Sequence, residues 1–270
     1  MFYFIPTPIG NLGDITLRAI ETLKSVDVIA CEDTRTSLKL LNKYEIKKPL
    51  YAYHKFNEIT SAEGLIKLHE EGKSVAVISD AGTPCVSDPG NVLTKILKER
   101  EIPYTALPGA TAFVPALILS GLDVSKFTFI GFLPEKRKEA EALIGRYKNL
   151  DATLIFYSAP HDLTRTVEVL YSVLGERNAT IVKEISKIHE SAESIKLNKG
   201  LNFDNAKGEY VIVVEGGKEE DDKMLSLTVE EHLNEYISRG IDKKEAVKLV
   251  AKERNIPKSE VYKYTLRKEV

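Results

Sequence analysis

Five polar loops, three of them with glycine and proline, follow short apolar runs in the first half of the chain, and each carries residue types that could bind a ligand or do chemistry. In chain order they read "PTPIGN", "CEDTR", "YHKFNE", "SDAGTPCVSDPG" and "LPGAT". In an open parallel sheet, loops of this kind lie beyond the carboxyl ends of the strands, where ligands bind. We therefore expect the five loops to line one crevice.

The loop at residues 79–90, "SDAGTPCVSDPG", could hold a phosphate, a metal or an organic ligand. It has neither the Walker pattern nor a GxGxxG fingerprint, and its prolines have no N–H to donate to a phosphate. Asp80 and Asp88 could share a hard cation, but the loop supplies no further ligands at calcium or magnesium spacing, so no metal site is predicted. A neutral or cationic ligand held by Asp80 and by backbone amides near Gly82 fits better.

Alternation of strands and helices indicates the fold of the first half. The apolar runs "FYFI", "VDVIAC", "LYAY", "VAVIS" and "YTALP" are typical of buried strands. Amphipathic helical patterns lie between them, the first with Asp14 as its expected N-cap. Crossover connections of this kind predict a parallel sheet with helices on both faces.

The second half predicts a different sheet. After the helical pattern "GATAFVPALILSGL" come strands at "FTFIGF", "ATLIFYS", "NATIVKEI", "ESIKLN" and "GEYVIVVEG", and the last three leave little room for helices between them. Antiparallel pairing is therefore expected, which makes this sheet mixed. We place an N-terminal α/β domain at 1–117, a second α/β domain at 118–217 and, after a charged linker, a helical extension at 225–270.

Composition limits the class of protein. The 270 residues carry a net charge of −2, so RNA binding would have to come from local basic patches. No apolar run reaches the roughly 18 residues of a membrane span, and the opening "MFYFIPTPIG" does not resemble a secretory signal. Cys31 and Cys85, both expected in strand-like surroundings, are predicted to be free thiols of a cytoplasmic protein.

Several motifs in this order resemble one known family. They are "FIPTPIGNLGDITLRAIETLKSVDVIACEDTR", "HKFNE", "SDAGTPCVSDPG", "LPGATA", "GFLP", "IFYSAPH" and "KGEYVIVVEG". Together they resemble the small-subunit ribosomal RNA methyltransferases of the tetrapyrrole methylase superfamily over about residues 1–217. The resemblance implies two α/β domains with S-adenosylmethionine in the cleft between them, usually in a homodimer. It also implies methyl transfer to the ribose 2′-hydroxyl of a cytidine in the decoding region of 16S rRNA.

The same resemblance implies which residues bind the cofactor. These are Pro8, Ile9, Asp80, Ala81, Gly82, Thr83, Val86, Thr111, Ala112, Tyr157 and Tyr210. Two stretches depart from the family pattern. Ser158 and Asp162 stand where relatives often have a glutamate and an arginine, and Lys183 and Ser186 are milder replacements. The charge lost at Asp162 puts RNA binding there in doubt, although Arg165 lies nearby.

Removal of the hydroxyl proton requires a base, which typically contributes about 10²- to 10⁴-fold to a rate. The candidates are Glu32, Asp33, His54, Glu58, Lys187 and Glu190. Each has a structural alternative. Asp33 could cap the helix that begins at Thr34, and His54 could be a loop histidine with satisfied hydrogen bonds.

Basic residues near these motifs are candidates for RNA binding. They are Arg35, Lys136, Arg137, Lys263 and Arg267, together with the polar Asn57. Arg35 could instead pair with Glu32 or Asp33, and Lys136 and Arg137 could simply be a solvated helix start. Two other functions remain open: a methylase acting on a tetrapyrrole or corrin, and a non-catalytic RNA-binding protein that keeps the fold. The complete cofactor loops argue against the latter.

Overall fold

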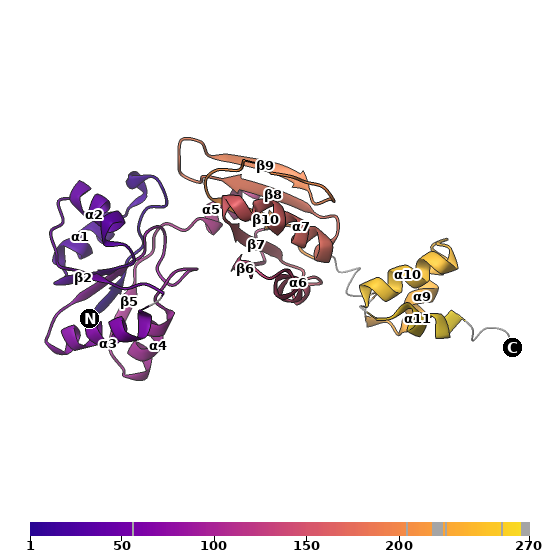
Figure 1. The fold of residues 1–270 in the computed structure, drawn as a ribbon, viewed down its shortest axis with the longest axis horizontal. Coiled ribbons are helices and arrows are strands. Elements are labelled where there is room, and N and C mark those ends of the chain that lie inside the picture. The colour runs from indigo at the N-terminus through magenta and orange to yellow at the C-terminus, as the bar shows by residue number, and fades with distance from the viewer. Residues whose placement is uncertain (56, 204, 218–223, 225, 255, 266–270) are drawn as a thin grey trace.

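The structure is a computed structural model that describes the chain except residues 56, 204, 218–223, 225, 255 and 266–270. Two sheet-containing units and a set of C-terminal helices follow one another along the chain (Figure 1). A parallel sheet, a mixed sheet and C-terminal helices are the elements expected from the sequence. The exact domain boundaries stay a prediction.

The first sheet is parallel throughout, as expected. Its strands are β1 (Phe2–Phe4), β2 (Val28–Cys31), β3 (Leu50–Ala52), β4 (Val75–Ile78) and β5 (Tyr104–Ala106), in the order β3-β2-β4-β1-β5. β2 and β4 are buried along their whole length because helices cover both faces. Every ligand-type loop therefore leaves the sheet at one edge.

Four helices cover the two faces of this sheet. α1 (Leu17–Ser25) and α2 (Thr34–Lys43) pack on one face, and α3 (Glu58–Glu70) and α4 (Asn91–Glu99) on the other (Figure 1). The apolar side chains fall into two clusters, one on each face, around Ile29 and Val77. Asp14 does not cap α1. It ends the short helix η1 (Leu12–Asp14), and Thr16 is the cap, accepting a 3.1 Å hydrogen bond from the Ala19 N–H.

The second sheet is mixed. Its strands are β6 (Phe127–Phe132), β7 (Thr153–Ser158), β8 (Asn178–Lys183), β9 (Ser191–Lys196) and β10 (Tyr210–Val214), in the order β6-β7-β10-β8-β9. β6 and β7 are parallel, whereas the other pairs are antiparallel. The antiparallel pairing of the last three strands confirms the interpretation drawn from their short connections.

Helices also cover both faces of the second sheet. α6 (Arg137–Gly145) and α7 (Leu163–Leu174) pack over a core that contains Phe156. α5 (Phe113–Ser120) packs on the opposite face against β8 and β10. The predicted boundary at 117/118 thus falls inside α5, a helix whose buried side belongs with the second sheet.

The C-terminal helices are α9 (Val229–Ser238), α10 (Lys243–Glu253) and α11 (Lys258–Thr265), which share a small core around Val247. Asp242 and Glu245 have the sequence spacing that predicts a capping box, but only the first half of the box forms. Asp242 caps α10 through the Lys244 N–H, but Glu245 pairs with Lys248 at 2.8 Å. The reciprocal box instead joins Thr228 and Glu231 at the start of α9.

Both cysteines are free thiols, as predicted. Cys31 is buried in β2, whereas Cys85 lies in the loop after β4 with a left-handed φ of 72°, so its strand-like surroundings were predicted wrongly. In the part of the chain that the structure describes, no helix is both long and apolar enough to span a membrane.

Candidate functional site

A cavity of about 420 Å³ lies between the two sheet units, at the carboxyl edge of the first sheet. The first unit contributes the loops after β1, β4 and β5, and the second contributes the ends of β6, β7, β8 and β10. The lining residues are Ile9, Asp80, Ala81, Gly82, Thr83, Val86, Ser87, Asp88, Thr111, Ala112, Phe132, Tyr157, Ser158, Ala159, Pro160, Ile185, Glu209, Tyr210 and Val211. The volume suits a small organic ligand.

Ten of the eleven residues that the resemblance implied for cofactor binding lie in this wall: Ile9, Asp80, Ala81, Gly82, Thr83, Val86, Thr111, Ala112, Tyr157 and Tyr210. Pro8 is not among the lining residues. Nine further lining residues were not predicted from the sequence: Ser87, Asp88, Phe132, Ser158, Ala159, Pro160, Ile185, Glu209 and Val211. Phe132 and Glu209 belong to the family motifs "GFLP" and "KGEYVIVVEG", so these motifs could have identified them as residues of the cavity wall.

Hydrogen bonds between loops fix the first-unit wall of the cavity. Thr7 and Gly82 exchange two backbone hydrogen bonds, at 2.8 and 3.0 Å, and the Thr7 hydroxyl donates to the Ser79 carbonyl at 3.0 Å. The Thr83 hydroxyl donates to the Ala110 carbonyl at 2.9 Å. The loops after β1, β4 and β5 are therefore joined into one rigid surface.

Gly82 leaves room in this surface. Its φ of 82° lies in the left-handed region, and an added Cβ would lie 3.4 Å from Cγ2 of Ile9. Side chains are disfavoured at that backbone conformation, and their absence lets a ligand approach the main chain. The cavity wall beside Asp80 is therefore formed by accessible main-chain atoms of Gly82 rather than by a packed side chain.

Carboxylates without cationic partners give the cavity region its charge. Burial and the Asp80 charge raise the pKa of Glu32, and burial raises the pKa of Asp80, opposed by a 3.1 Å hydrogen bond from the Asp33 N–H. Burial, together with the charges of Glu32 and Asp80, raises the pKa of Asp88 to about 7, although a Ser79 hydrogen bond opposes the shift. Among the described residues, none of these three carboxyl groups has a salt bridge. The region is suited to a cationic ligand.

Metal ligation has little support in the described residues, where no group of three or more His, Cys, Asp or Glu side chains is placed to hold an ion.

Asp33 and Arg35 lie at the start of α2 and outside the cavity wall. Asp33 caps the helix, accepting a 2.8 Å hydrogen bond from the Arg35 N–H, and also binds the Arg35 guanidinium at 2.8 Å. These hydrogen bonds hold the pKa of Asp33 at about 2. The structural alternatives for both residues are therefore realised, while the Arg35 side chain, 88% exposed, still faces solvent.

The side chain of Glu58 stabilises the fold by accepting hydrogen bonds from two other segments. Its Oε1 accepts a hydrogen bond from the buried Gly90 N–H at 2.7 Å and another from the Tyr53 hydroxyl at 3.1 Å. It thus ties the start of α3 to the loop after β4. The neighbouring Asn57 accepts from the His54 N–H at 2.8 Å and donates to the Ala52 carbonyl at 3.3 Å, so its amide stabilises the turn before α3. His54 is half-buried, and its proximity opposes the rise in the pKa of Glu32.

Lys187 joins the two sheet units. Its ammonium group donates to Glu184 at 2.8 Å and Glu209 at 2.9 Å, and its aliphatic stem covers Gly10, where an added Cβ would lie 2.5 Å from its Cγ. Burial lowers the pKa of Lys187, but the two carboxylate hydrogen bonds outweigh this and the net pKa is raised. A protonated lysine is a poor base, so the geometry favours a positioning role. The Ser186 hydroxyl donates to Asp14 across the same junction.

Glu190, the last base candidate, accepts a 2.6 Å hydrogen bond from the Ser186 N–H and so fixes the turn that carries Lys187.

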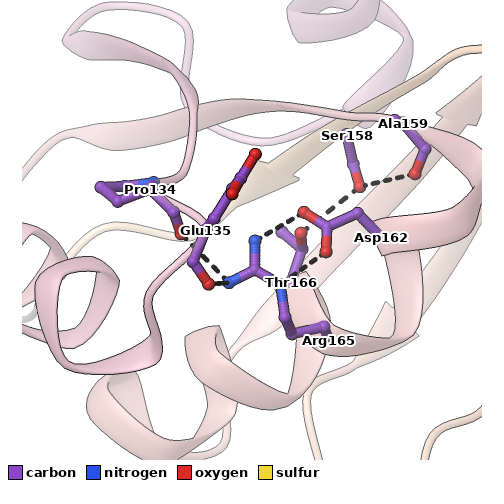
Figure 2. A network of polar contacts seen from close by, with 7 residues as sticks. All are labelled: Pro134, Glu135, Ser158, Ala159, Asp162, Arg165 and Thr166. Carbon is purple, nitrogen blue, oxygen red and sulfur yellow. Dashed lines mark hydrogen bonds and ion pairs between the residues drawn. The ribbon is translucent and has the colours of Figure 1, made fainter.

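Asp162 and Arg165 form the polar network shown in Figure 2. Two hydrogen bonds, at 2.5 and 2.6 Å, join the guanidinium to the carboxylate and lower the pKa of Asp162. The same guanidinium donates to the carbonyls of Pro134 and Glu135, at 3.1 and 3.0 Å. Arg165 therefore connects α7 to the end of the "GFLP" segment, which holds Phe132 at the cavity, and its charge is used within the protein.

The remaining RNA-binding candidates lie on helix surfaces. Lys136 and Arg137 pair with Glu139 and Glu141 at the start of α6. Lys263 is in the last turn of α11, and Arg267 lies outside the described residues. Of the described candidates, Lys136, Arg137 and Lys263 are not among the residues that line the cavity.

Comparison with known proteins identifies the class. The family model for Tetrapyrrole (Corrin/Porphyrin) Methylases matches residues 1–199. Among solved structures, uroporphyrin-III-C-methyltransferase from Thermus thermophilus has a TM-score of 0.58 at 22% identity, covering 79% of this chain and 93% of that one. Diphthine synthase has a TM-score of 0.60 at 17% identity, covering 80% and 89%. At these identities the likeness shows the fold.

Sequence relatives narrow the class. "Ribosomal RNA small subunit methyltransferase I" of Bacillus subtilis is 42% identical, covering 97% of this chain and 92% of the relative. The protein of the same name from Haemophilus influenzae is 40% identical, covering 98% and 96%. The chain belongs to the tetrapyrrole methylase family, in the branch formed by these ribosomal RNA small subunit methyltransferases. It is a methyltransferase of the type that uses S-adenosylmethionine.

The cavity fits this cofactor. S-adenosylmethionine carries a sulfonium and an ammonium group, which complement the unpaired carboxylates, and an adenine ring that suits apolar and aromatic walls such as Ile9 and Tyr157. The open backbone at Gly82 allows close contact with a nucleoside.

The position of Glu58 predicts a measurable effect on stability. Glu58→Ala would leave the Gly90 N–H and the Tyr53 hydroxyl without their acceptor, at a cost of about 1–3 kcal/mol for each buried group. We expect urea unfolding to show a loss of about 2 kcal/mol or more. Glu63→Ala on the same helix removes an exposed pair with Arg100 and should cost less than about 1 kcal/mol. Equal losses in the two variants would contradict this role of Glu58.

Proposed function

We propose that the protein transfers the methyl group of S-adenosylmethionine to the ribose 2′-hydroxyl of a cytidine in the decoding region of 16S rRNA. The observation that carries the proposal is the cavity between the two α/β units, lined by ten of the residues that the family resemblance assigns to the cofactor. The relatives named as small-subunit ribosomal RNA methyltransferases support the choice of RNA over a tetrapyrrole.

The chain's own residues would bind and align the reactants. Asp80 would attract the positive charge of the cofactor, the backbone of Ala81 and Thr83 would provide amide contacts, and Tyr157 would close the pocket from the second unit. The cofactor supplies an electrophilic methyl group. Alignment of this group with the hydroxyl provides much of the rate, because effective molarities of oriented groups can reach about 10⁵ M or more.

RNA would approach from the exposed parts of the same edge. Arg35 projects into solvent beside the loop after β2, and Asn57 shapes the next loop. Lys136 and Arg137 flank the "GFLP" segment, while Lys263 and Arg267 belong to the helical extension. These cations would contact phosphates, which position a nucleic acid without reading its sequence. An rRNA substrate and two free thiols agree with a cytoplasmic location.

The substrate can be tested directly. Purified protein is incubated with labelled S-adenosylmethionine and either small ribosomal subunits, naked 16S rRNA or a tetrapyrrole, and the products are digested and identified. We expect label in a 2′-O-methylcytidine from the decoding region. Label on a base, or on the tetrapyrrole alone, would contradict the proposal. So would the absence of label on any RNA despite cofactor binding by calorimetry.

Asp80 provides a test of the cofactor site. Asp80→Asn keeps an oxygen for the Asp33 N–H but removes the negative charge. We expect calorimetry to show about 10- to 100-fold weaker binding of S-adenosylmethionine, since hydrogen bonds to charged groups contribute about 1.5–3 kcal/mol. The control is Asp151→Asn, which removes an exposed charge paired with Lys126 and should leave affinity unchanged. Unchanged affinity in Asp80→Asn would remove this residue from the site.

We also propose a homodimer, as the family resemblance implies. The outer face of α5 is apolar: Val114 and Ile118, one turn apart, are 43% and 68% exposed, and Leu119 is 44% exposed. Exposed apolar patches of this kind mark association surfaces. Light scattering is expected to show a dimer for the native chain and a monomer for Ile118→Asp, while Ile188→Asp, at a 97% exposed position, stays dimeric. A monomeric native chain would exclude the dimer.

A further inference from the structure

We propose that Asp88 is the catalytic base, the carboxylate that accepts the proton of the ribose hydroxyl during methyl transfer. The inference rests on the proposed function and extends it to a residue considered above only as a possible cation ligand. Asp88 does not cap α4, because Gly90 occupies the N-cap position of that helix. Asp88 is instead one of the residues that line the cavity.

The first observation is where Asp88 lies. It is half-buried in the wall of the cavity, in the part of the loop after β4 that reaches toward the second unit. The preceding Ser87 packs against the bulge of β6, where an added Cβ on Gly131 would lie 3.0 Å from the serine hydroxyl. Asp88 therefore stands at the junction of the two units, in the wall of the cavity proposed to hold the cofactor.

The second observation is the backbone that holds Asp88 there. Cys85 and Ser87 have left-handed φ values of 72° and 66°, and Gly90 has 136°. Left-handed φ at residues other than glycine costs about 1–3 kcal/mol each, and such strain persists where the surroundings enforce it, often at functional sites. Here the Cys85 N–H donates to the Pro89 carbonyl at 3.2 Å, and Glu58 holds the Gly90 N–H. The fold thus maintains a strained loop that presents one carboxyl group.

The groups facing Asp88 determine its protonation. Ser79, Asp80 and Cys85 lie in the same loop after β4 as Asp88, and Glu58 lies close to Cys85. Glu32 lies at the end of β2, with His54 close to it. Tyr157 faces Asp88 from β7. Burial and the negative charges of Glu32 and Asp80 place its pKa at about 7. A carboxyl group with this pKa is ionised in a large fraction of molecules at neutral pH and is far more basic than an ordinary aspartate.

The other candidates are placed less well. Asp33 is held by Arg35 at a pKa of about 2, Lys187 is protonated between two carboxylates, and neither lines the cavity. Glu32, the nearest competitor, also lies outside the lining residues.

The step is balanced in charge and atoms. The hydroxyl proton passes to a carboxylate oxygen of Asp88 while the oxygen bonds to the methyl carbon, and the methyl–sulfur bond breaks with its electron pair going to sulfur. The positive charge of the sulfonium and the negative charge of Asp88 both disappear, leaving a neutral thioether and a neutral carboxylic acid. The acid then loses its proton to water.

Activity assays at saturating RNA, with the cofactor varied up to saturation, test this role. The native kcat/KM for the cofactor is expected to rise with pH, reach half its maximum near pH 7 and level off above, because it follows ionisation of the base in the free protein. The native kcat is expected to reach half its maximum at a lower pH, because the bound cationic cofactor favours the ionised base. Asp88→Asn should lower kcat by about 10²- to 10⁴-fold and lower the affinity for S-adenosylmethionine by no more than about tenfold. Asp88→Glu should restore part of the pH-dependent rate, and Asp151→Asn serves as the control for a surface carboxylate.

Glu32→Gln separates the two carboxyl groups. If Asp88 is the base, this variant keeps a high kcat at pH 8 and its half-maximal rate moves to lower pH, because one negative charge that raises the pKa of Asp88 is gone. A large loss of kcat in Glu32→Gln with little loss in Asp88→Asn would assign the base to Glu32 and overturn the proposal.

A binding measurement gives a readout that does not depend on activity. A cationic cofactor favours the ionised form of Asp88, so binding at pH 7 should release part of a proton. Calorimetry in buffers of different ionisation enthalpy should detect this release in the native protein and not in Asp88→Asn. Equal release in both would overturn the proposal, as would a kcat of Asp88→Asn within about tenfold of native. If the native protein labels no ribose, the proposed function itself fails.

Discussion

The pair of backbone hydrogen bonds between Thr7 and Gly82 is the contact on which the site depends. It joins the loops after two neighbouring strands, β1 and β4, just beyond the edge of the parallel sheet. Because β1 and β4 are parallel, both loops leave the sheet at the same edge, and the bridge makes them one surface. The left-handed Gly82, the Asp80 carboxyl and the strained residues that follow are all positioned from this point.

Charge is distributed unevenly between the site and the rest of the protein. Lys187, at the junction of the two units, and Arg165, within the second unit, have carboxylate partners and bind loops together. Asp80 and Asp88, in contrast, face the cavity without salt bridges among the described residues. Burying a carboxyl group without a partner is unfavourable, so the pKa of each is raised. A cationic cofactor would supply the missing charge, and this links cofactor binding to the protonation of the site.

Much of the fold could be predicted, because the signals are local. Continuous β-branched runs such as 75–78 indicated buried parallel strands, and the short connections around β8, β9 and β10 indicated antiparallel pairing. The failures have local causes too. Asp14 was expected to cap α1, but the intervening turn η1 moves the cap to Thr16. Cys85 was assigned to a strand-like setting because neighbouring residue types do not reveal a left-handed φ.

The sequence by itself determined which loops meet at one edge of the sheet, since the parallel direction of the strands follows from the alternation of helices and strands, whereas the strand order came from the structure. It also marked Asp80 and Gly82 through their positions after a buried strand. Only the tertiary structure decided the roles of the charged residues. Whether Asp33, Glu58 or Lys187 faces a ligand or stabilises a loop depends on partners distant in the chain, such as Gly90 for Glu58 and Gly10 for Lys187. The place of Asp88 in the cavity likewise depends on packing between the two units, which no local pattern records.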